Sequence, residues 1–189
     1  MAVFRAFKAL RPTEGKAAAV AALPYDVVNR EEAAAIGKEN PDSFLHVDRA
    51  EMDLPAETDL YDVKVYQKAK ENLHKMEETG VLVQDHKPCY YIYELVRKGK
   101  VQTGIAGCAS IDDYLNNVVK KHELTRSDKE LDRINHVDVC DANTGPIYLA
   151  CRYTDALSAL LEQWKKEHKA AYDFTEEDEI THRVWVIDG

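Results

Sequence analysis

Residues 120–141, KKHELTRSDKELDRINHVDVCD, gather cationic, hydroxyl and carboxylate side chains around an expected helix start. Backbone N–H groups at a helix start bind anions, and an arginine adds a forked, bidentate contact to phosphate. The side chains expected to hold phosphate are Lys121, Thr125, Arg126, Lys129 and Arg133. The segment therefore predicts a site for an anionic, phosphate-bearing ligand. The alternative is a solvated loop in which Ser127 caps the helix and Asp128 and Glu130 fill its first turn.

Three side chains are candidates for acid–base chemistry beside such a phosphate. Glu123 or Asp26 would serve as a base or as a metal-binding carboxylate, and His122 would orient the base or act as an acid. The expected reaction is phosphate transfer to a small hydroxyl substrate, with Mg²⁺ neutralising charge and a nucleotide or pyrophosphate as donor. For Asp26, which lies in a short turn, the alternative is an Asx-turn that caps local backbone.

Substrate contacts are expected from Tyr25, Asn143 and Thr144. Tyr25 precedes Asp26 in the turn Pro24-Tyr25-Asp26, and Asn143 and Thr144 lie in a polar loop that enters an apolar run. Loops at the ends of strands commonly carry function. A plain turn is the equal alternative for this loop.

Composition limits the classes of partner. A net charge of −9 over 189 residues argues against a nucleic-acid or anionic-membrane surface, but it leaves room for a small basic pocket. No apolar run approaches the ~20 residues of a membrane span, and the N-terminus lacks the features of a signal peptide. Four widely spaced cysteines indicate free thiols in a reducing cytoplasm. The sequence leaves the oligomeric state open, a homo-oligomer included.

The common catalytic and metal-binding motifs are absent from the sequence. It contains no P-loop, no strand-linked GxGxxG, no HExxH and no GxSxG elbow. His122, His136 and Cys140 match no standard zinc spacing, so no metal site is assigned. His136 is instead expected to be a satisfied histidine at the edge of the core.

The expected fold is α/β (α+β), with one mixed sheet and flanking helices in a single domain over residues 1–189. Helices are expected near 30–38, 60–79, 127–141 and 155–168. Asn29 is the expected N-cap of the first helix. In the second, apolar residues spaced by three and four predict a buried stripe of Leu60, Val63, Tyr66, Ala69, Leu73 and Met76. In the third, the residues expected to point inward are Leu131, Ile134 and either Val137 or Val139. Asp132 and Arg133 are expected to project toward the site, and the alternative is that they form an ordinary surface ion pair.

Strands are expected at 2–10, 43–48, 89–96, 101–111, 146–153 and 183–187. Lys98-Gly99 is the expected turn of a hairpin, and Gly104 and Gly107 are expected to mark a bulge or a close backbone approach. Because the last strand ends the chain, the chain is expected to be the N-terminal portion of a longer protein.

Five motifs in this order resemble one widespread bacterial and archaeal domain-of-unknown-function family, often labelled SpoOJ/ParB-like. They are PYDVV, ENPDSFLHV, YYIY, KKHELTRSDKELDR and ANTGPIYLACRY. The resemblance covers essentially the whole chain. Members of the family continue beyond the final strand into a DGHHR-type motif that looks like the phosphate-handling motif of ParB and sulfiredoxin-like domains.

This resemblance implies a nucleotide-binding fold whose distant relatives phosphorylate free serine. The positions that match are Pro24, Tyr25, Asp26, His122, Glu123, Thr125, Arg126, Lys129, Asp132 and Arg133. The leading expectation is a phosphate- or nucleotide-binding protein that transfers phosphate to a small hydroxyl substrate such as free serine. The alternatives are a non-catalytic regulatory module and a ParB-like partner in DNA partitioning, and the acidic charge disfavours the second.

Overall fold

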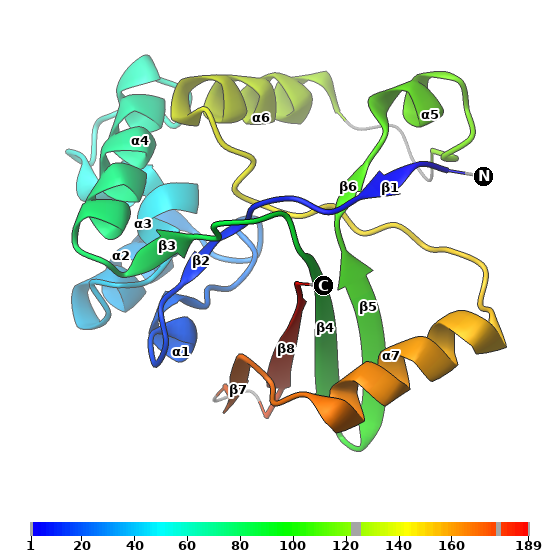
Figure 1. The fold of residues 1–189 in the computed structure, drawn as a ribbon. Helices are drawn as coiled ribbons and strands as arrows, with labels where there is room; N and C mark the ends of the chain where they lie inside the picture. Colours follow the sequence, from blue (N-terminus) through cyan, green and yellow to red (C-terminus); the bar gives the residue numbers. More distant parts are fainter. Residues whose placement is uncertain (1, 122–125, 177–178, 189) are drawn as a thin grey trace. The chain divides into compact units, whose positions relative to one another are not determined.

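The computed structural model describes residues 2–121, 126–176 and 179–188. It contains helices and antiparallel strand pairs, so the predicted α+β class is confirmed (Figure 1). Within the described residues, no helix is long and apolar enough to cross a membrane.

The chain divides into two compact units, and each is described by itself. The sheet unit consists of Met1–Ala18, Gln84–His122 and Ile147–Gly189, and the helical unit consists of Ala19–Val83 and Glu123–Pro146. Two short elements lie where the chain passes from one unit to the other. They are α1 (Ala17–Val20) and β3 (Leu82–Gln84).

A four-stranded sheet with the order β5-β4-β8-β7 forms the centre of the sheet unit (Figure 1). Its strands are β4 (Tyr90–Arg97), β5 (Lys100–Ala106), β7 (Tyr172–Thr175) and β8 (Thr181–Ile187). Every pairing in this sheet is antiparallel, which corrects the expected mixed sheet. Lys98 and Gly99 have φ angles of 49° and 74°, so they form the predicted hairpin turn in the conformation that matches strand twist.

Helix α7 (Asp155–Glu167) covers one face of this sheet (Figure 1). Thr154 caps it by accepting a hydrogen bond from a backbone N–H, and Leu161 packs with Ile92 and Trp185 in the core. The helix confirms the prediction near 155–168. Leu161 is 8% exposed and Leu160 is 63% exposed, so the buried face of the helix is narrow.

The rest of the sheet unit consists of short elements. They are β1 (Phe4–Arg5), β2 (Leu10–Pro12), β6 (Cys108–Ala109) and α5 (Ile111–Leu115). β1 pairs with β6, and a side chain at Gly107 would meet the Phe4 ring at 2.6 Å, so the predicted close approach exists there. At Gly104 a side chain would meet open space, so that prediction is wrong. The predicted strand at 146–153 is also wrong, since no described strand pairs with it and Tyr148 is 80% exposed.

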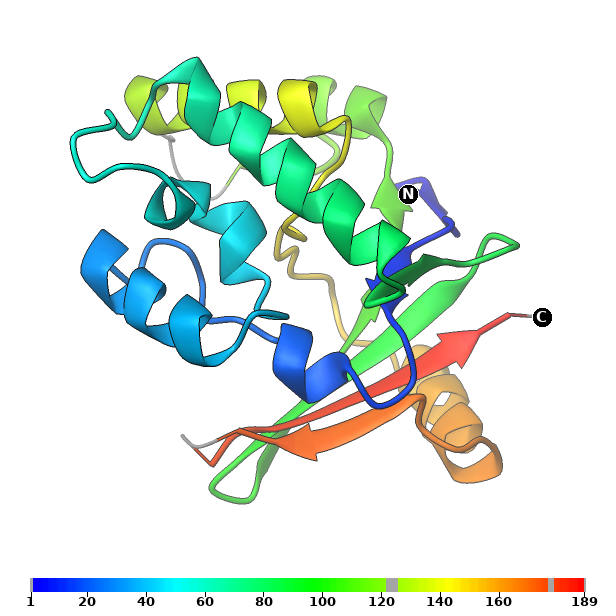
Figure 2. The ribbon, with the colours of Figure 1, turned by 90° about the vertical axis from the view of Figure 1, so that its left-hand side faces the viewer.

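The helical unit packs short helices around two longer ones (Figure 2). Its elements are α2 (Arg30–Glu39), α3 (Leu45–Asp48), η1 (Ala50–Asp53), α4 (Val63–Glu78) and α6 (Ser127–Cys140). Asn29 caps α2 through a capping box with Glu32, as predicted. Val28, Ala33 and Leu45 form a core with partly buried side chains around them.

Residues 43–48 form part of a turn and helix α3, so the predicted strand is wrong. The backbone N–H of Ser43 donates to the Asn40 carbonyl, and that of Asp48 donates to Phe44. Leu45 and Val47 are 1% and 0% exposed. A single helical turn thus buries the two apolar residues that alternation had assigned to one face of a strand.

Helix α4 begins at Val63 because the Asp62 carboxylate accepts a hydrogen bond from the Lys64 backbone N–H. The predicted stripe is therefore buried from Tyr66 onward, whereas Val63 is 56% exposed. Leu60, which precedes the helix, is 45% exposed.

Helix α6 has the predicted extent, but the face that it buries is not the predicted one. Its buried side chains are Asp132, His136 and Cys140, which are spaced by four and so share one face. Of the residues expected to point inward, Leu131, Ile134 and Val137 are at least 41% exposed, and only Val139 is half-buried. The prediction assumed that apolar side chains face the core. Here the polar residues do so, because partners on neighbouring segments accept or donate their hydrogen bonds.

A partly buried polar cluster at His46 connects α2, α3, η1 and α4. His46 Nδ1 lies 2.8 Å from an Asp53 carboxylate oxygen, and Nε2 lies 3.3 Å from the Gly37 carbonyl oxygen. Asn72 donates to the same carboxylate at 2.8 Å. The hydrogen bond to Asp53 raises the pKa of His46, although burial opposes the rise. Both partners accept, so the cluster favours the imidazolium.

We expect His46→Gln to destabilise the protein by about 1 kcal/mol more at pH 6 than at pH 8.5. A raised folded-state pKa gives stability that is complete below the unfolded pKa and is lost as the pH rises through the folded value. Urea denaturation at both pH values measures the difference. His74→Gln is the control, because the side chain of His74 is 56% exposed. Equal pH dependence of the two variants would contradict the assignment.

Candidate functional site

A small, partly open cavity of about 40 Å³ lies within the helical unit, between α4, α6 and the segment that contains α3 and η1. Next to it, a shallow groove of about 530 Å³ runs along α6. Tyr25, Lys129 and Arg133 line both hollows. These three side chains therefore stand at the border between the cavity and the groove.

Arg133 is held in place from two sides. Its Nε and Nη2 donate to Asp132 Oδ2 at 3.1 and 2.9 Å, and its guanidinium carbon lies 4.3 Å from the centroid of the Tyr25 ring. Among the described residues, no hydrogen-bond partner is found for Nη1. The guanidinium is therefore oriented and still has donor capacity for a ligand.

Lys129 precedes Arg133 by four residues, so the two cations lie one helical turn apart on the same face of α6. Its Nζ lies 3.5 Å from the Tyr61 hydroxyl oxygen, and within the described parts of the chain it forms no ion pair. An ammonium beside an oriented guanidinium is a suitable pair for a phosphate group.

Asp132 is the buried counter-charge of Arg133. It is 8% exposed and accepts a hydrogen bond from the Tyr66 hydroxyl at 3.0 Å. Burial and this hydrogen bond raise the pKa of Tyr66, so the hydroxyl remains a donor. The Asp132–Arg133 pair is thus partly buried, and the alternative of an ordinary surface pair does not hold.

The cavity wall also carries Asp48 and His136. Burial raises the pKa of Asp48, whose carboxylate accepts a hydrogen bond from the Thr144 hydroxyl at 2.9 Å. His136 is 2% exposed, and its Nε2 lies 3.1 Å from the Val47 carbonyl oxygen. Since a carbonyl can only accept, Nε2 is the donor, and Nδ1 of the neutral ring is an acceptor. His136 is therefore satisfied at only one of its two nitrogens.

The structure brings together some of the predicted site residues and separates others. Tyr25, Lys129 and Arg133 meet at the cavity, and Thr144 reaches it through Asp48. Asp26 and Asn143 are exposed and do not line the cavity. The predicted residues His122, Glu123 and Thr125 lie outside the described part of the chain.

Two predicted phosphate ligands have other contacts. Arg126 donates through Nε and Nη2 to the Asp128 carboxylate at 3.1 and 2.7 Å, and its side chain is 76% exposed. Arg126 also occupies the N-cap position of α6, without a capping hydrogen bond from its side chain. Lys121 belongs to the sheet unit, where its Nζ lies 4.7 Å from the centroid of the Tyr114 ring.

Sequence reasoning missed the polar lining formed by Asp48, Tyr66 and His136. The spacing of Asp132, His136 and Cys140 by four was a usable signal, since it marks one face of α6. The apolar series Leu131, Ile134 and Val137 is equally periodic and was preferred because apolar residues are usually the buried ones.

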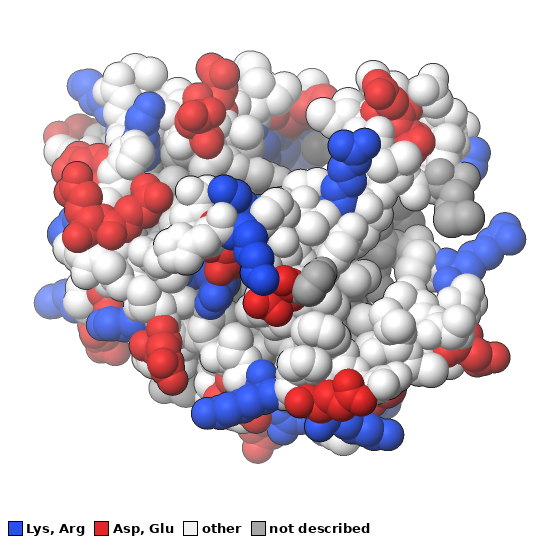
Figure 3. Space-filling model, in the orientation of Figure 1, with Lys and Arg blue, Asp and Glu red and all other residues white. Residues whose placement is uncertain are grey.

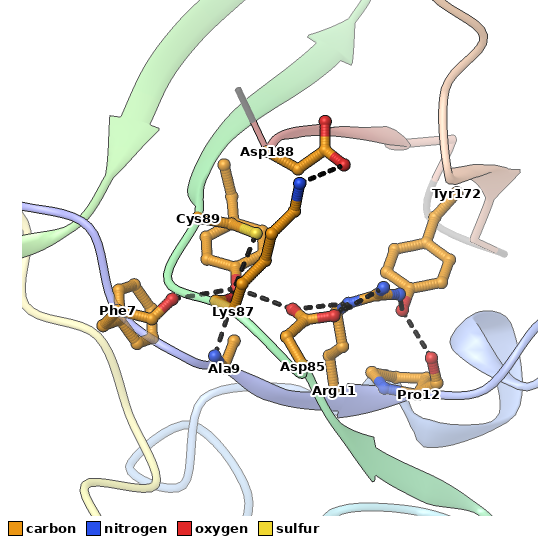
Figure 4. Close-up of polar contacts among 10 residues, drawn as sticks. Phe7, Ala9, Arg11, Pro12, Asp85, Lys87, Cys89, Tyr172 and Asp188 are labelled. Carbon is orange, nitrogen blue, oxygen red and sulfur yellow. Dashed lines mark hydrogen bonds and ion pairs between the residues drawn. The ribbon is translucent and has the colours of Figure 1, made fainter.

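In a second polar cluster, in the sheet unit, the side chains pair with one another (Figure 4). The Asp85 carboxylate accepts hydrogen bonds from Arg11 at 2.9 Å and from the Tyr91 hydroxyl at 2.6 Å. Arg11 also donates to Tyr172 at 2.7 Å, and Tyr172 donates to the Pro12 carbonyl oxygen. Burial alone would raise the pKa of Asp85, but these contacts hold that pKa below its usual range. The cluster ties the N-terminal segment to the sheet.

Charges of both signs are interspersed on the face shown in Figure 3. In that view the described residues form no continuous basic surface of the kind that binds a nucleic-acid backbone. The local pair of cations on α6 is therefore the feature that indicates a ligand class.

Comparison with known proteins gives a family and no activity. A family model described as "Protein of unknown function (DUF1015)" matches residues 4–189. No curated protein and no solved structure matches the chain. The match confirms the resemblance to a domain-of-unknown-function family, and its description does not support the SpoOJ/ParB label.

Proposed function

The chain belongs to this family of proteins of unknown function, and we propose that its helical unit binds a small phosphorylated ligand at Lys129, Arg133 and Tyr25. One observation carries the proposal. Two cations on one face of α6 border a cavity, one oriented by Asp132 and Tyr25 and the other without an ion-pair partner among the described residues. An arginine fork fixed by a carboxylate and an aromatic ring is preorganised for a phosphate oxygen.

Phosphate transfer to a small hydroxyl substrate is the catalytic form of this proposal, with a nucleotide or pyrophosphate as donor. Asp48 supports it, because a partly buried carboxylate with a raised pKa is suited to receive a proton from a hydroxyl. In the described part of the chain, no cluster of three His, Cys, Asp or Glu side chains could hold a metal ion, so Mg²⁺ would enter with the phosphates. Binding without turnover would instead identify a regulatory module.

Calorimetric titration of the chain with pyrophosphate, inorganic phosphate and ATP, each with and without Mg²⁺, tests the binding proposal. We expect Arg133→Gln to weaken the binding of the tightest of these ligands by about tenfold or more. Lys129→Gln should weaken it severalfold. Arg133→Lys keeps the charge opposite Asp132 and loses the fork, so it should fall between wild type and Arg133→Gln.

Lys75→Gln is the matched control, because Lys75 is an exposed lysine of α4 that does not line the cavity. Its affinity should equal that of the wild type. Thermal unfolding of each variant shows that the fold is intact. Unchanged affinity in Arg133→Gln, or an equal loss in Lys75→Gln, would refute the site.

A further inference from the structure

Three residues that line the cavity beside Arg133 carry buried polar atoms without hydrogen-bond partners among the described residues. Five such side-chain atoms occur among the described residues, and three belong to residues of this cavity: Arg49 Nε, Glu51 Oε1 and His136 Nδ1. Glu51 Oε1 does lie 2.8 Å from Arg49 Nη2, so it has an ion pair without hydrogen-bond geometry. Buried polar groups are rarely left without partners, because desolvation is costly. Their concentration around one cavity indicates a polar occupant.

The chemistry of the lining specifies that occupant. Glu51 Oε1 is an acceptor, and His136 Nδ1 is an acceptor when only Nε2 carries a proton, so the occupant must donate hydrogen bonds to them. Arg49 Nε is a donor, so the occupant must also accept. A hydroxyl group does both, whereas a carboxylate only accepts and an ammonium only donates.

The size of the cavity limits the occupant further. A cavity needs about 10–15 Å³ of free space to hold one water molecule, and pockets for whole ligands measure about 300–1,000 Å³. The cavity of about 40 Å³ therefore has room for a hydroxymethyl-sized group and not for a nucleobase or a sugar ring. His136 follows Arg133 by three residues, which is about 4.5 Å along the helix axis. A phosphate at Arg133 and a hydroxyl at His136 would thus belong to a short molecule.

We propose that the ligand is a short hydroxyalkyl phosphate whose hydroxyl end enters the cavity at His136, Glu51 and Arg49. This inference rests on the proposed phosphate site and names its substrate class. In this proposal the hydroxyl group of the ligand determines which phosphate compound binds, and Lys129 and Arg133 hold its phosphate group. Nucleotides, if they bind, keep their base and ribose outside the cavity.

Glycerol 3-phosphate and propyl phosphate form a matched pair of probes, since the second keeps the phosphate and the three-carbon chain but lacks the hydroxyls. Calorimetry on the wild type should show at least tenfold tighter binding of glycerol 3-phosphate, because a site with unpaired polar groups rejects the analogue without hydroxyls. His136→Gln keeps a donor toward Val47 and changes the ring acceptor. We expect it to reduce the preference to about twofold and to leave propyl phosphate binding unchanged.

The outcomes separate this inference from the function on which it rests. Equal, Arg133-dependent affinity for both probes would overturn the hydroxyl site and leave the phosphate site in place. Binding of pyrophosphate with neither probe would also overturn it. Absence of binding by every phosphate compound would overturn both. The comparison of glycerol 3-phosphate with propyl phosphate on the wild type tests the hydroxyl site even if His136→Gln does not fold.

Discussion

Replacing Lys165 by methionine is expected to lower the free energy of unfolding of the sheet unit by about 3 kcal/mol. Glu94, in the central strand β4, is 6% exposed, and Lys165 Nζ lies 2.6 Å from its carboxylate. Arg183 lies farther away, at 3.3 Å. Burial alone would raise the pKa of Glu94, but hydrogen bonds from Lys165 and Arg183 hold that pKa below its usual range. Methionine keeps the apolar length of lysine and leaves the buried carboxylate without its nearest counter-charge.

Lys166→Met is the matched control for Lys165→Met, because Lys166 is the exposed neighbour on the same helix. We expect it to change stability by less than about 0.5 kcal/mol. Urea denaturation followed by tryptophan fluorescence reports this unit, since both tryptophans, Trp164 and Trp185, belong to it. Equal effects of the two variants would show that α7 does not depend on the buried ion pair.

The stability difference between wild type and Lys165→Met should depend on pH. A depressed carboxylate pKa gives stability that is complete above the unfolded value and is lost as the pH falls through the folded value. The difference in stability between wild type and Lys165→Met should therefore narrow in acid.

The second large effect is expected for Asp85→Asn, which should lower the free energy of unfolding by about 2 kcal/mol. The substitution keeps the size of the side chain but removes the charge opposite Arg11, whose Nη2 lies 2.8 Å from Asp85. Their side chains are 27% and 12% exposed, so water replaces the lost interaction only in part. The Tyr91 hydroxyl also loses its charged acceptor.

Asp188→Asn is the control for Asp85→Asn and lies in the same region of the sheet unit (Figure 4). Asp188 pairs with Lys87 at 3.2 Å, and both side chains are more than half exposed, so the pair should contribute less than about 1 kcal/mol. Tryptophan fluorescence in urea measures both variants. If Asp85→Asn and Asp188→Asn were equally stable, the cluster in Figure 4 would not stabilise the N-terminal segment.

Local signals in the sequence predicted much of the fold. Asn29 caps α2 because its side-chain oxygen accepts a hydrogen bond from a nearby backbone N–H, a pattern visible in a short window. The turn at Lys98 and Gly99 is also local. Elements of this kind need no knowledge of the tertiary structure.

The errors arose where tertiary contacts decide. Residues 43–48 alternate like a strand, and a single turn of α3 buries Leu45 and Val47 equally well. Helix α6 carries two periodic series, and the polar one is buried because Tyr66 and Val47 supply its partners. Periodicity cannot choose between such series. The choice depends on side chains far away in the sequence.

In the candidate site, too, some features follow from local sequence and others depend on tertiary contacts. Tyr25, Lys129 and Arg133 could be selected by residue type, since aromatic and cationic side chains are usual phosphate and substrate contacts. That Asp132 orients Arg133 and that Asp128 engages Arg126 depends on rotamers and burial. Both arginines donate through Nε and Nη2 to a carboxylate. They differ because Arg133 lies against the Tyr25 ring at the cavity whereas Arg126 is 76% exposed, and sequence spacing does not reveal that difference.

Side-chain NMR of the arginine Nε–Hε groups during titration with pyrophosphate is the most direct test of the phosphate site. Arg133→Lys and Arg126→Lys variants assign the two signals. The proposed site predicts a saturable shift of the Arg133 signal together with the Tyr25 ring resonances, while the Arg126 signal stays in place because Arg126 does not line the cavity. A shift of Arg126 with Arg133 and Tyr25 unmoved would place the phosphate at the start of α6 and contradict the site proposed for the cavity.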